Sequence, residues 1–271
     1  MTIGGIDMEG TLTKSLSQQV VEWTRDWFRE NGRETAVIGI SGGKDSAVVA
    51  GICVAALGKE NVVGVLMPNG VQPDIGDSVK VVEQLGIRRM DVNISGMCEA
   101  GLVAMNKAIK LATEAGFLDE QLVRCVTKAA YINMQPRIRM TTLYTVAQSL
   151  SGPGGMKACV VGTGNKAESM VGYTTKGGDA MCDMDPIGGL WVDEVIQVGD
   201  ELGVCPEVVH KAPSDGLCGQ TDEDRLGYTY DEVKLVFTGH DDEVDPERGR
   251  VIMDAHAASA HKRRMPPMFL R

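Results

Sequence analysis

The sequence lacks three features that would place the protein in a membrane or outside the cell. Its apolar stretches are shorter than the ~20 residues that span a bilayer. Its start, MTIGGIDMEGTLTK, has neither the basic beginning nor the apolar core of a signal peptide. Its 7 cysteines include no C-x-x-C pair, so neither a disulfide framework nor a zinc site is indicated. We therefore expect a soluble, cytoplasmic protein with reduced thiols.

An excess of basic residues is also missing. The chain has 27 Lys and Arg against 37 Asp and Glu, a net charge of −10. Proteins with a broad nucleic-acid surface neutralise phosphates with surplus Lys and Arg, so nucleic acid is not an expected partner. A local basic pocket for a phosphorylated small molecule remains compatible with this charge.

Internal repeats, low-complexity tracts and linkers rich in Pro, Gly or Ser are absent too. Of the 271 residues, 43% are hydrophobic and 24% charged, which excludes a disordered chain. A chain of this length can bury a substantial core. We expect a single domain over residues 1–271.

Short apolar segments alternate with helical patterns along the chain. The predicted strands cover residues 35–41, 61–67, 88–94 and 158–162. The predicted helices cover residues 15–30, 45–57, 74–86, 99–115, 135–150, 193–202, 206–212, 229–237 and 247–260. This alternation predicts an α/β fold with a parallel sheet covered by helices. Ligands of such sheets bind beyond the carboxyl ends of the strands.

A Gly-rich polar loop, Ser41-Gly42-Gly43-Lys44-Asp45-Ser46, lies between the first predicted strand and its helix. Two glycines let the backbone turn sharply and present N–H groups to an anion, and the helix N-terminus adds a favourable dipole. Asp45 would repel a phosphate unless a divalent cation intervened, so its position indicates Mg²⁺. The alternative is a Gly-Gly turn with a Ser or Asp helix cap.

A second polar turn, Gly162-Thr-Gly-Asn-Lys-Ala-Glu-Ser169, follows the fourth predicted strand. Glu168 could complete a Mg²⁺ site begun by Asp45. The alternative is a turn in which Glu168 only favours a helix N-terminus.

Three further segments carry charged or polar groups. Arg137 and Arg139 stand at the predicted opening of a helix, where arginine suits carboxylate and phosphate. The loop of residues 172–185 holds Lys176, Asp179, Asp183 and Asp185, and His261-Lys-Arg-Arg264 comes near the C-terminus. Taken singly, each of these groups is more often a solvated side chain than a ligand.

The string S-G-G-x-D-S resembles the PP-loop of the ATP pyrophosphatases, and differs from the P-loop and dinucleotide motifs. These enzymes have a Rossmann-like fold of the adenine nucleotide alpha hydrolase type, with a twisted parallel sheet flanked by helices. The resemblance implies activation of a carboxylate or carbonyl by adenylation, with release of pyrophosphate. The PP-loop resemblance indicates the type of reaction but does not identify the substrate.

G-T-G-N-K-A-E-S, G-Y-T-T-K-G-G-D and a terminal H-K-R-x-x-P, in this order, resemble the ammonia-dependent NAD synthetases from about residue 15 to 271. The resemblance implies that Asp45 and Glu168 hold Mg²⁺ and that two subunits share the substrate cleft as a homodimer. The implied ATP contacts are Gly39, Ile40, Ser41, Gly42, Gly43, Lys44, Asp45, Ser46, Thr163 and Ser214. The implied deamido-NAD contacts are Arg137, Lys176, Asp183, His261 and Lys262.

The chain departs from the family pattern at several positions. Val192 stands where many relatives have an ATP-contacting Lys, and Ser214 where many have Thr. Pro136 replaces a common Ala, and Gly177 a common aromatic residue. Lys44 places a cation where many relatives are neutral, and we expect it near the pyrophosphate.

The implied reaction has two steps. The nicotinate carboxylate of deamido-NAD attacks the α-phosphorus of ATP, giving an acyl-adenylate and pyrophosphate. Ammonia then attacks the activated carbonyl, giving NAD and AMP, and Asp179 is the candidate to deprotonate ammonium. One α/β domain leaves no room for a glutamine-using domain, so free or delivered ammonia is expected. The apolar face of residues 15–30 or the helix at 135–150 could form a dimer interface or belong to the core.

Two other functions compete with this interpretation. Another PP-loop enzyme, such as a tRNA thiolase, would usually display paired cysteines and a basic RNA surface, which this chain lacks. A non-catalytic nucleotide-binding protein would not require paired acids placed to hold Mg²⁺.

Overall fold

A single parallel sheet organises the chain, whose computed structural model describes residues 14–72, 75–155, 157–211 and 222–269, apart from the side chains of Asp222 and Asp224. Within these residues four strands pair in the order β3-β2-β1-β4. They are β1 (Thr35–Gly39), β2 (Val62–Leu66), β3 (Arg88–Asp91) and β4 (Ala158–Val160). Because all pairs are parallel, their carboxyl ends meet at one edge. The predicted parallel α/β sheet is confirmed.

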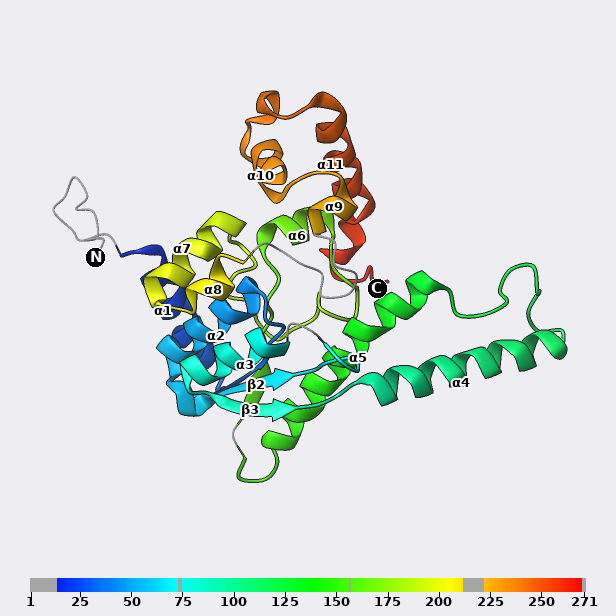
Figure 1. The fold of residues 1–271 in the computed structure, drawn as a ribbon, viewed down its shortest axis with the longest axis horizontal. Coiled ribbons are helices and arrows are strands. Elements are labelled where there is room, and N and C mark those ends of the chain that lie inside the picture. The colour runs from blue at the N-terminus through cyan, green and yellow to red at the C-terminus, as the bar shows by residue number, and fades with distance from the viewer. Residues whose placement is uncertain (1–13, 73–74, 156, 212–221, 270–271) are drawn as a thin grey trace.

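Helices from the first third of the chain and from residues 192–209 cover one face of the sheet (Figure 1). Ile38 of β1 and Leu66 of β2 point into this layer and are buried. The helices are α1 (Leu16–Glu30), α2 (Lys44–Leu57), α3 (Ile75–Leu85), α7 (Val192–Leu202) and α8 (Pro206–Val209). Alternation along each strand sends its other side chains to the opposite face.

The opposite face packs on α5 (Lys128–Leu150) and on the start of α4 (Ser95–Glu114). Val37 and Val160 meet Leu143 and Val146 in this second core. The apolar faces of α1 and of residues 135–150 therefore pack within the chain, which makes both of them core elements.

A smaller helical layer stands at the carboxyl edge of the sheet (Figure 1). It contains α6 (Lys166–Val171), α9 (Asp222–Leu226), α10 (Tyr230–Thr238) and α11 (Pro246–Ala258). Trp191, Val233 and Ile252 lie in its own apolar cluster. Three 3₁₀ turns complete the described elements, at Lys59–Asn61, Asp241–Glu243 and Ala260–Lys262.

The far part of α4 extends away from the body of the molecule (Figure 1). Its exposed side chains include Val103, Met105 and Leu111, and Phe117 and Leu122 are exposed just after it. Although α4 and α5 are long, no helix of the described chain is both long and apolar enough to cross a membrane.

Besides α9, which was not predicted, and α8, which ends at Val209 and not at residue 212, two helices differ from the prediction. The helix expected at 135–150 begins at Lys128, capped by Thr127, and continues through Pro136. Proline removes one N–H donor, and the helix tolerates that loss here because packing on the sheet holds it. The second helix, α6, lies in a stretch expected to be loop, where Asn165 and Glu168 form a capping box at its start.

Candidate active site

The phosphate loop leaves the carboxyl end of β1 and enters α2, as the motif predicted. Gly42 has a φ of +83°, which favours glycine. The backbone N–H of Ser41 donates to Ser46 Oγ at 3.2 Å, and that of Gly43 donates to Ser41 Oγ at 3.2 Å. Ser46 Oγ in turn donates to the Gly43 carbonyl at 3.1 Å. These bonds fix the loop around the positive end of α2.

Residues of β1, the segment after β2 and α3 pack closely against the phosphate loop. Gly39 ends β1, and a Cβ on it would lie 3.1 Å from Met67 Cε. Ile40 is buried in the core beneath the loop. A Cβ on Gly42 would lie 3.1 Å from Ser78 Oγ and 3.2 Å from Ser78 N, so the first turn of α3 abuts the loop. Two helix N-termini thus converge on one backbone turn.

The turn after β4 lies beside the phosphate loop, because β4 is the neighbour of β1 in the sheet. It carries Thr163, which is half-buried, and Glu168 in the first turn of α6. Glu168 Oε2 accepts the Asn165 N–H at 3.0 Å, and Asn165 Oδ1 accepts the Glu168 N–H at 3.1 Å. Glu168 therefore caps the N-terminus of α6, which is the alternative role considered for it. It does so at the position where a metal ligand was expected.

Asp185 is a member of this site that the sequence did not single out. Its Oδ2 accepts the Gly164 N–H at 3.2 Å, and its Oδ1 accepts the Ile187 N–H at 3.2 Å. A Cβ on Gly164 would lie 3.5 Å from Asp185 Oδ2 and 3.9 Å from Glu168 Oε2. The pKa of Asp185 also responds to the negative charge of Asp45. Asp185 thus connects the two carboxylates that were expected to share a metal.

The donor set fits a hard cation that shares its coordination with a substrate. In the part of the chain that the structure describes, no three His, Cys, Asp or Glu side chains form a complete metal cluster. Mg²⁺ usually takes one or two carboxylates and fills its remaining positions with water and phosphate oxygens. Asp45 and Glu168 stand on adjacent loops at the phosphate-binding edge, which suits that pattern.

A pocket of about 250 Å³ opens beside these acids. Its lining includes Asp185, Asp179 and Lys262, with Asn165 and Ser169. Asp179 Oδ1 accepts the Thr175 N–H at 2.7 Å. Burial raises the pKa of Asp179, while hydrogen bonds from Thr175 and the charge of Lys262 oppose the rise. A carboxylate with a raised pKa can exchange a proton near neutrality more readily than an ordinary one.

The cationic side chains predicted to contact deamido-NAD donate hydrogen bonds to backbone carbonyls. Lys262 Nζ donates to the carbonyl of Gly172 at 2.7 Å and to that of Thr174 at 2.6 Å. Lys176 Nζ donates to the carbonyl of His261 at 3.1 Å, and Arg137 Nε donates to that of Lys176 at 3.1 Å. The structure therefore brings α5, the loop after α6 and the segment after α11 into one network.

Two other predicted contacts stand apart from this network. Asp183 is exposed, and its Oδ2 accepts the Val160 N–H at 2.8 Å while its Oδ1 accepts from Tyr144 Oη at 3.4 Å. It therefore anchors the turn to β4. Ser214 lies outside the described residues.

The stability of the protein is expected to depend on pH through Asp185. Burial, with a smaller contribution from Asp45, raises the pKa of Asp185 from 3.8 to about 6, against the opposing backbone N–H bonds. Charging Asp185 is therefore less favourable in the folded state, so stability is lost as pH rises from about 4 through 6. Relative to Asp185→Asn, the wild type is expected to lose on the order of 2–3 kcal/mol of unfolding free energy across that window. Urea denaturation of both proteins in EDTA at each pH measures the difference, and a pH-independent difference would contradict the expectation.

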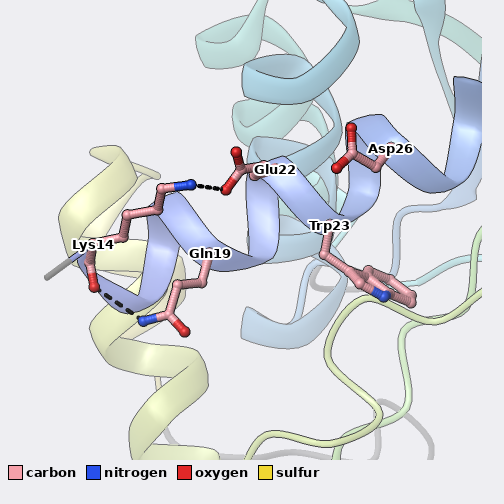
Figure 2. A pocket seen from close by; sticks show the side chains of 5 residues that line it. All are labelled: Lys14, Gln19, Glu22, Trp23 and Asp26. Atoms are coloured by element: carbon pink, nitrogen blue, oxygen red, sulfur yellow. Dashed lines mark hydrogen bonds and ion pairs between the residues drawn. The ribbon is translucent and has the colours of Figure 1, made fainter.

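A second hollow, lined by Lys14, Gln19, Glu22, Trp23 and Asp26, lies on the outer side of α1 (Figure 2). Lys14 pairs with Glu22, and Gln19 Nε2 donates to the Lys14 carbonyl at 3.0 Å. All five side chains come from one helix and the residues just before it, with none from the loops of the sheet. This hollow has no part in the chemistry of the site.

Comparison with known proteins matches most of the chain to NAD synthetases. A family model described as NAD synthase matches residues 16–266. The chain is 39% identical to the NH(3)-dependent NAD(+) synthetase of Alkaliphilus metalliredigens, over 93% of this chain and 96% of that protein. It is 38% identical to the enzyme of the same name from Archaeoglobus fulgidus, over 93% and 96%.

The solved structures give a similar result for the fold. An NMN synthetase from Francisella tularensis superposes with a TM-score of 0.75 at 32% identity, over 93% of this chain and 96% of that one. An NH3-dependent NAD synthetase from Campylobacter jejuni superposes with a TM-score of 0.72 over 94% and 98%. Its identity of 24% supports a likeness of fold alone.

Proposed function

The chain belongs to the NAD synthase family, and from this we propose that it catalyses the ATP-dependent amidation of deamido-NAD by ammonia, giving NAD, AMP and pyrophosphate. The main support is the position of the phosphate loop on β1 beside the acid-bearing turn on β4, within a chain that matches ammonia-using relatives over nearly their whole length. We further propose that residues 1–271 form one domain and that the protein works in the cytoplasm.

The expected chemistry needs positioning and charge neutralisation more than a side-chain nucleophile. The loop of residues 41–46 receives the ATP phosphates through backbone N–H groups, and Thr163 and Ser214 supply further ATP contacts. Asp45 and Glu168 would hold Mg²⁺, which when bound neutralises phosphate charge. The nicotinate carboxylate can then reach the α-phosphorus and form the acyl-adenylate.

The amidation step would use the pocket beside Asp185. Asp179 lies in that pocket, and burial raises its pKa. We assign it the proton of the incoming ammonium, while Arg137, Lys176, Asp183, His261 and Lys262 shape the deamido-NAD cleft. Four of these five groups bond to backbone, so part of their contribution is to position loops around the substrate.

A homodimer is part of the same proposal. The apolar side chains exposed on α4 and just after it, among them Val103, Leu111 and Phe117, offer a surface that a second copy would cover. If sedimentation gives a monomeric mass at micromolar concentration, the proposal that two subunits share the substrate cleft is wrong.

One observation supports a second candidate substrate. The structure that is 32% identical to the chain over 93% of its length is that of an NMN synthetase. The name of that neighbour makes nicotinate mononucleotide a second candidate substrate, for which the amidation would be the same and only the remainder of the substrate would differ.

The test is a product assay with both substrates. Deamido-NAD or nicotinate mononucleotide is incubated with ATP and Mg²⁺, with ammonium, with glutamine or without a nitrogen source, and the products are separated. The amide is expected only with ammonium, with equal amounts of AMP and pyrophosphate, and the higher kcat/KM identifies the substrate. Amide formation with glutamine alone would overturn the nitrogen source. Absence of AMP and pyrophosphate would overturn the function.

A further inference from the structure

Asp77 places a negative charge beside the loop that is proposed to receive the ATP phosphates. It lies in the first turn of α3, and its Cβ is 3.3 Å from the position that a Cβ on Gly42 would occupy. A carboxylate in this turn favours the N-terminus of α3. The same charge would repel an incoming triphosphate unless a cation neutralised it.

Lys211, in the segment just after α8, supplies that cation. Its Nζ donates to Asp77 Oδ2 at 2.7 Å. The exposed fractions are 33% for the Lys211 side chain and 24% for that of Asp77, so solvent screens this pair less than it screens a fully exposed one. The hydrogen bond from Lys211 is also the main reason why the pKa of Asp77 lies below its usual value.

A second cation near Asp77 is divided between two acids. Lys80 Nζ lies 3.5 Å from Asp77 Oδ1 and 3.1 Å from Glu207 Oε2, so its shorter contact is with Glu207. The Lys80 side chain is also more exposed than that of Lys211. Loss of Lys211 would therefore leave most of the Asp77 charge without compensation, whereas loss of Lys80 would leave the 2.7 Å pair intact.

We propose that Lys211 is a positioning residue of the reaction, which neutralises Asp77 and so allows the triphosphate of ATP to approach the phosphate loop. This inference rests on the proposed function, which brings the phosphates to that loop. The ion pair joins two parts of the chain that are 134 residues apart. Its alternative role is only to hold these two parts together, and the two roles predict different results when both partners are replaced.

A double-variant cycle separates the two roles. Isothermal titration of the full chain with α,β-methylene-ATP in Mg²⁺ buffer measures nucleotide binding without turnover, because this analogue cannot be cleaved between its α- and β-phosphates. We expect Lys211→Met to weaken binding about 5- to 10-fold, and Lys80→Met, the control that removes an equal charge, less than about 2-fold. Asp77→Asn and the double variant Asp77→Asn/Lys211→Met should both bind within about 2-fold of the wild type, because neither leaves a carboxylate beside the loop.

The effect of Lys211→Met should also depend on salt. Its affinity relative to the wild type should recover as NaCl is raised from about 0.05 to about 0.5 M, since salt screens the repulsion. A lost tether would not be rescued by Asp77→Asn, which breaks the same ion pair. The proposal is wrong if Lys211→Met binds the analogue as tightly as the wild type, if the double variant binds as weakly as Lys211→Met, or if the loss persists unchanged at high salt.

The proposed function is judged separately, by amide formation in the wild type. A wild type that forms the amide while the cycle shows no rescue would reject only this inference. Thermal unfolding of each variant without nucleotide checks that the fold is intact. Should Lys211→Met lose its cooperative unfolding transition, Lys211→Gln takes its place in the same cycle.

Discussion

Replacing Asp45 with asparagine is expected to lower kcat for amide formation by on the order of 10³-fold. Asp45 lies in the first turn of α2, at the mouth of the phosphate loop, and is the carboxylate proposed to hold Mg²⁺ there. Asparagine keeps the shape of the side chain but removes the charge that a hard cation requires. The unfolding free energy should change by less than about 1 kcal/mol, because the lost dipole interaction is small and repulsion of Asp185 is relieved.

Steady-state assays over a range of Mg²⁺ concentrations measure this effect. Glu247→Gln is the matched control, since Glu247 is an exposed carboxylate in the first turn of α11, away from the phosphate loop. It should leave kcat within about twofold of the wild type. An Asp45→Asn enzyme that keeps a tenth of the activity with an unchanged Mg²⁺ requirement would remove Asp45 from the metal site.

Replacing Gly172 with alanine is expected to destabilise the C-terminal helical layer by about 3–5 kcal/mol. Gly172 ends α6 with a φ of +67°, and a Cβ there would lie 2.1 Å from Ser259 Cβ. Ser259 is buried, and its Oγ accepts from Arg263 at 2.8 Å. The clash would therefore separate α6 from the end of α11 and displace Lys262 from the Gly172 carbonyl.

Gly203→Ala separates the steric effect from the backbone effect. Gly203 ends α7 with a φ of +66°, and a Cβ on it would meet nothing within 4 Å. It should cost only about 1 kcal/mol, the strain of alanine in the left-handed region. Urea denaturation followed by circular dichroism compares the two variants with the wild type. Equal losses of unfolding free energy in the two variants would show that the clash with Ser259 is not the reason why Gly172 must be glycine.

The sequence was informative wherever a local pattern determines structure. Three of the strands, β1, β2 and β4, are short apolar runs that are buried in the sheet, whereas β3 is a polar and exposed edge strand. All four were predicted near their observed bounds. The phosphate loop was found for the same reason, since its glycines, hydroxyls and Asp45 are consecutive. Their position at the carboxyl edge follows from the parallel sheet alone.

Features that depend on distant contacts were not predicted. Asp185 looks like an ordinary loop acid until the turn of residues 162–164 folds over its carboxylate. Lys262 looks like a free cation until Gly172 and Thr174 present their carbonyls to it. In both cases the partner is remote in sequence, and no local periodicity reports it. The substrate contacts assigned by resemblance remain predictions.

The strand order also has a consequence for how activity arises during synthesis. β1 acquires β2 and β3 soon after it is made, but its other neighbour is β4, with Thr35 paired to Ala158 far downstream. Pairing over such a separation is the slow part of building a parallel sheet. The phosphate loop is therefore synthesised long before the acids beside it, and β4 completes the sheet before the segments that carry Asp185 and Lys262 can complete the site. A nascent chain that stops before β4 would contain the phosphate loop but would leave the apolar edge of β1 without its partner strand. Such a chain would have no catalytic activity.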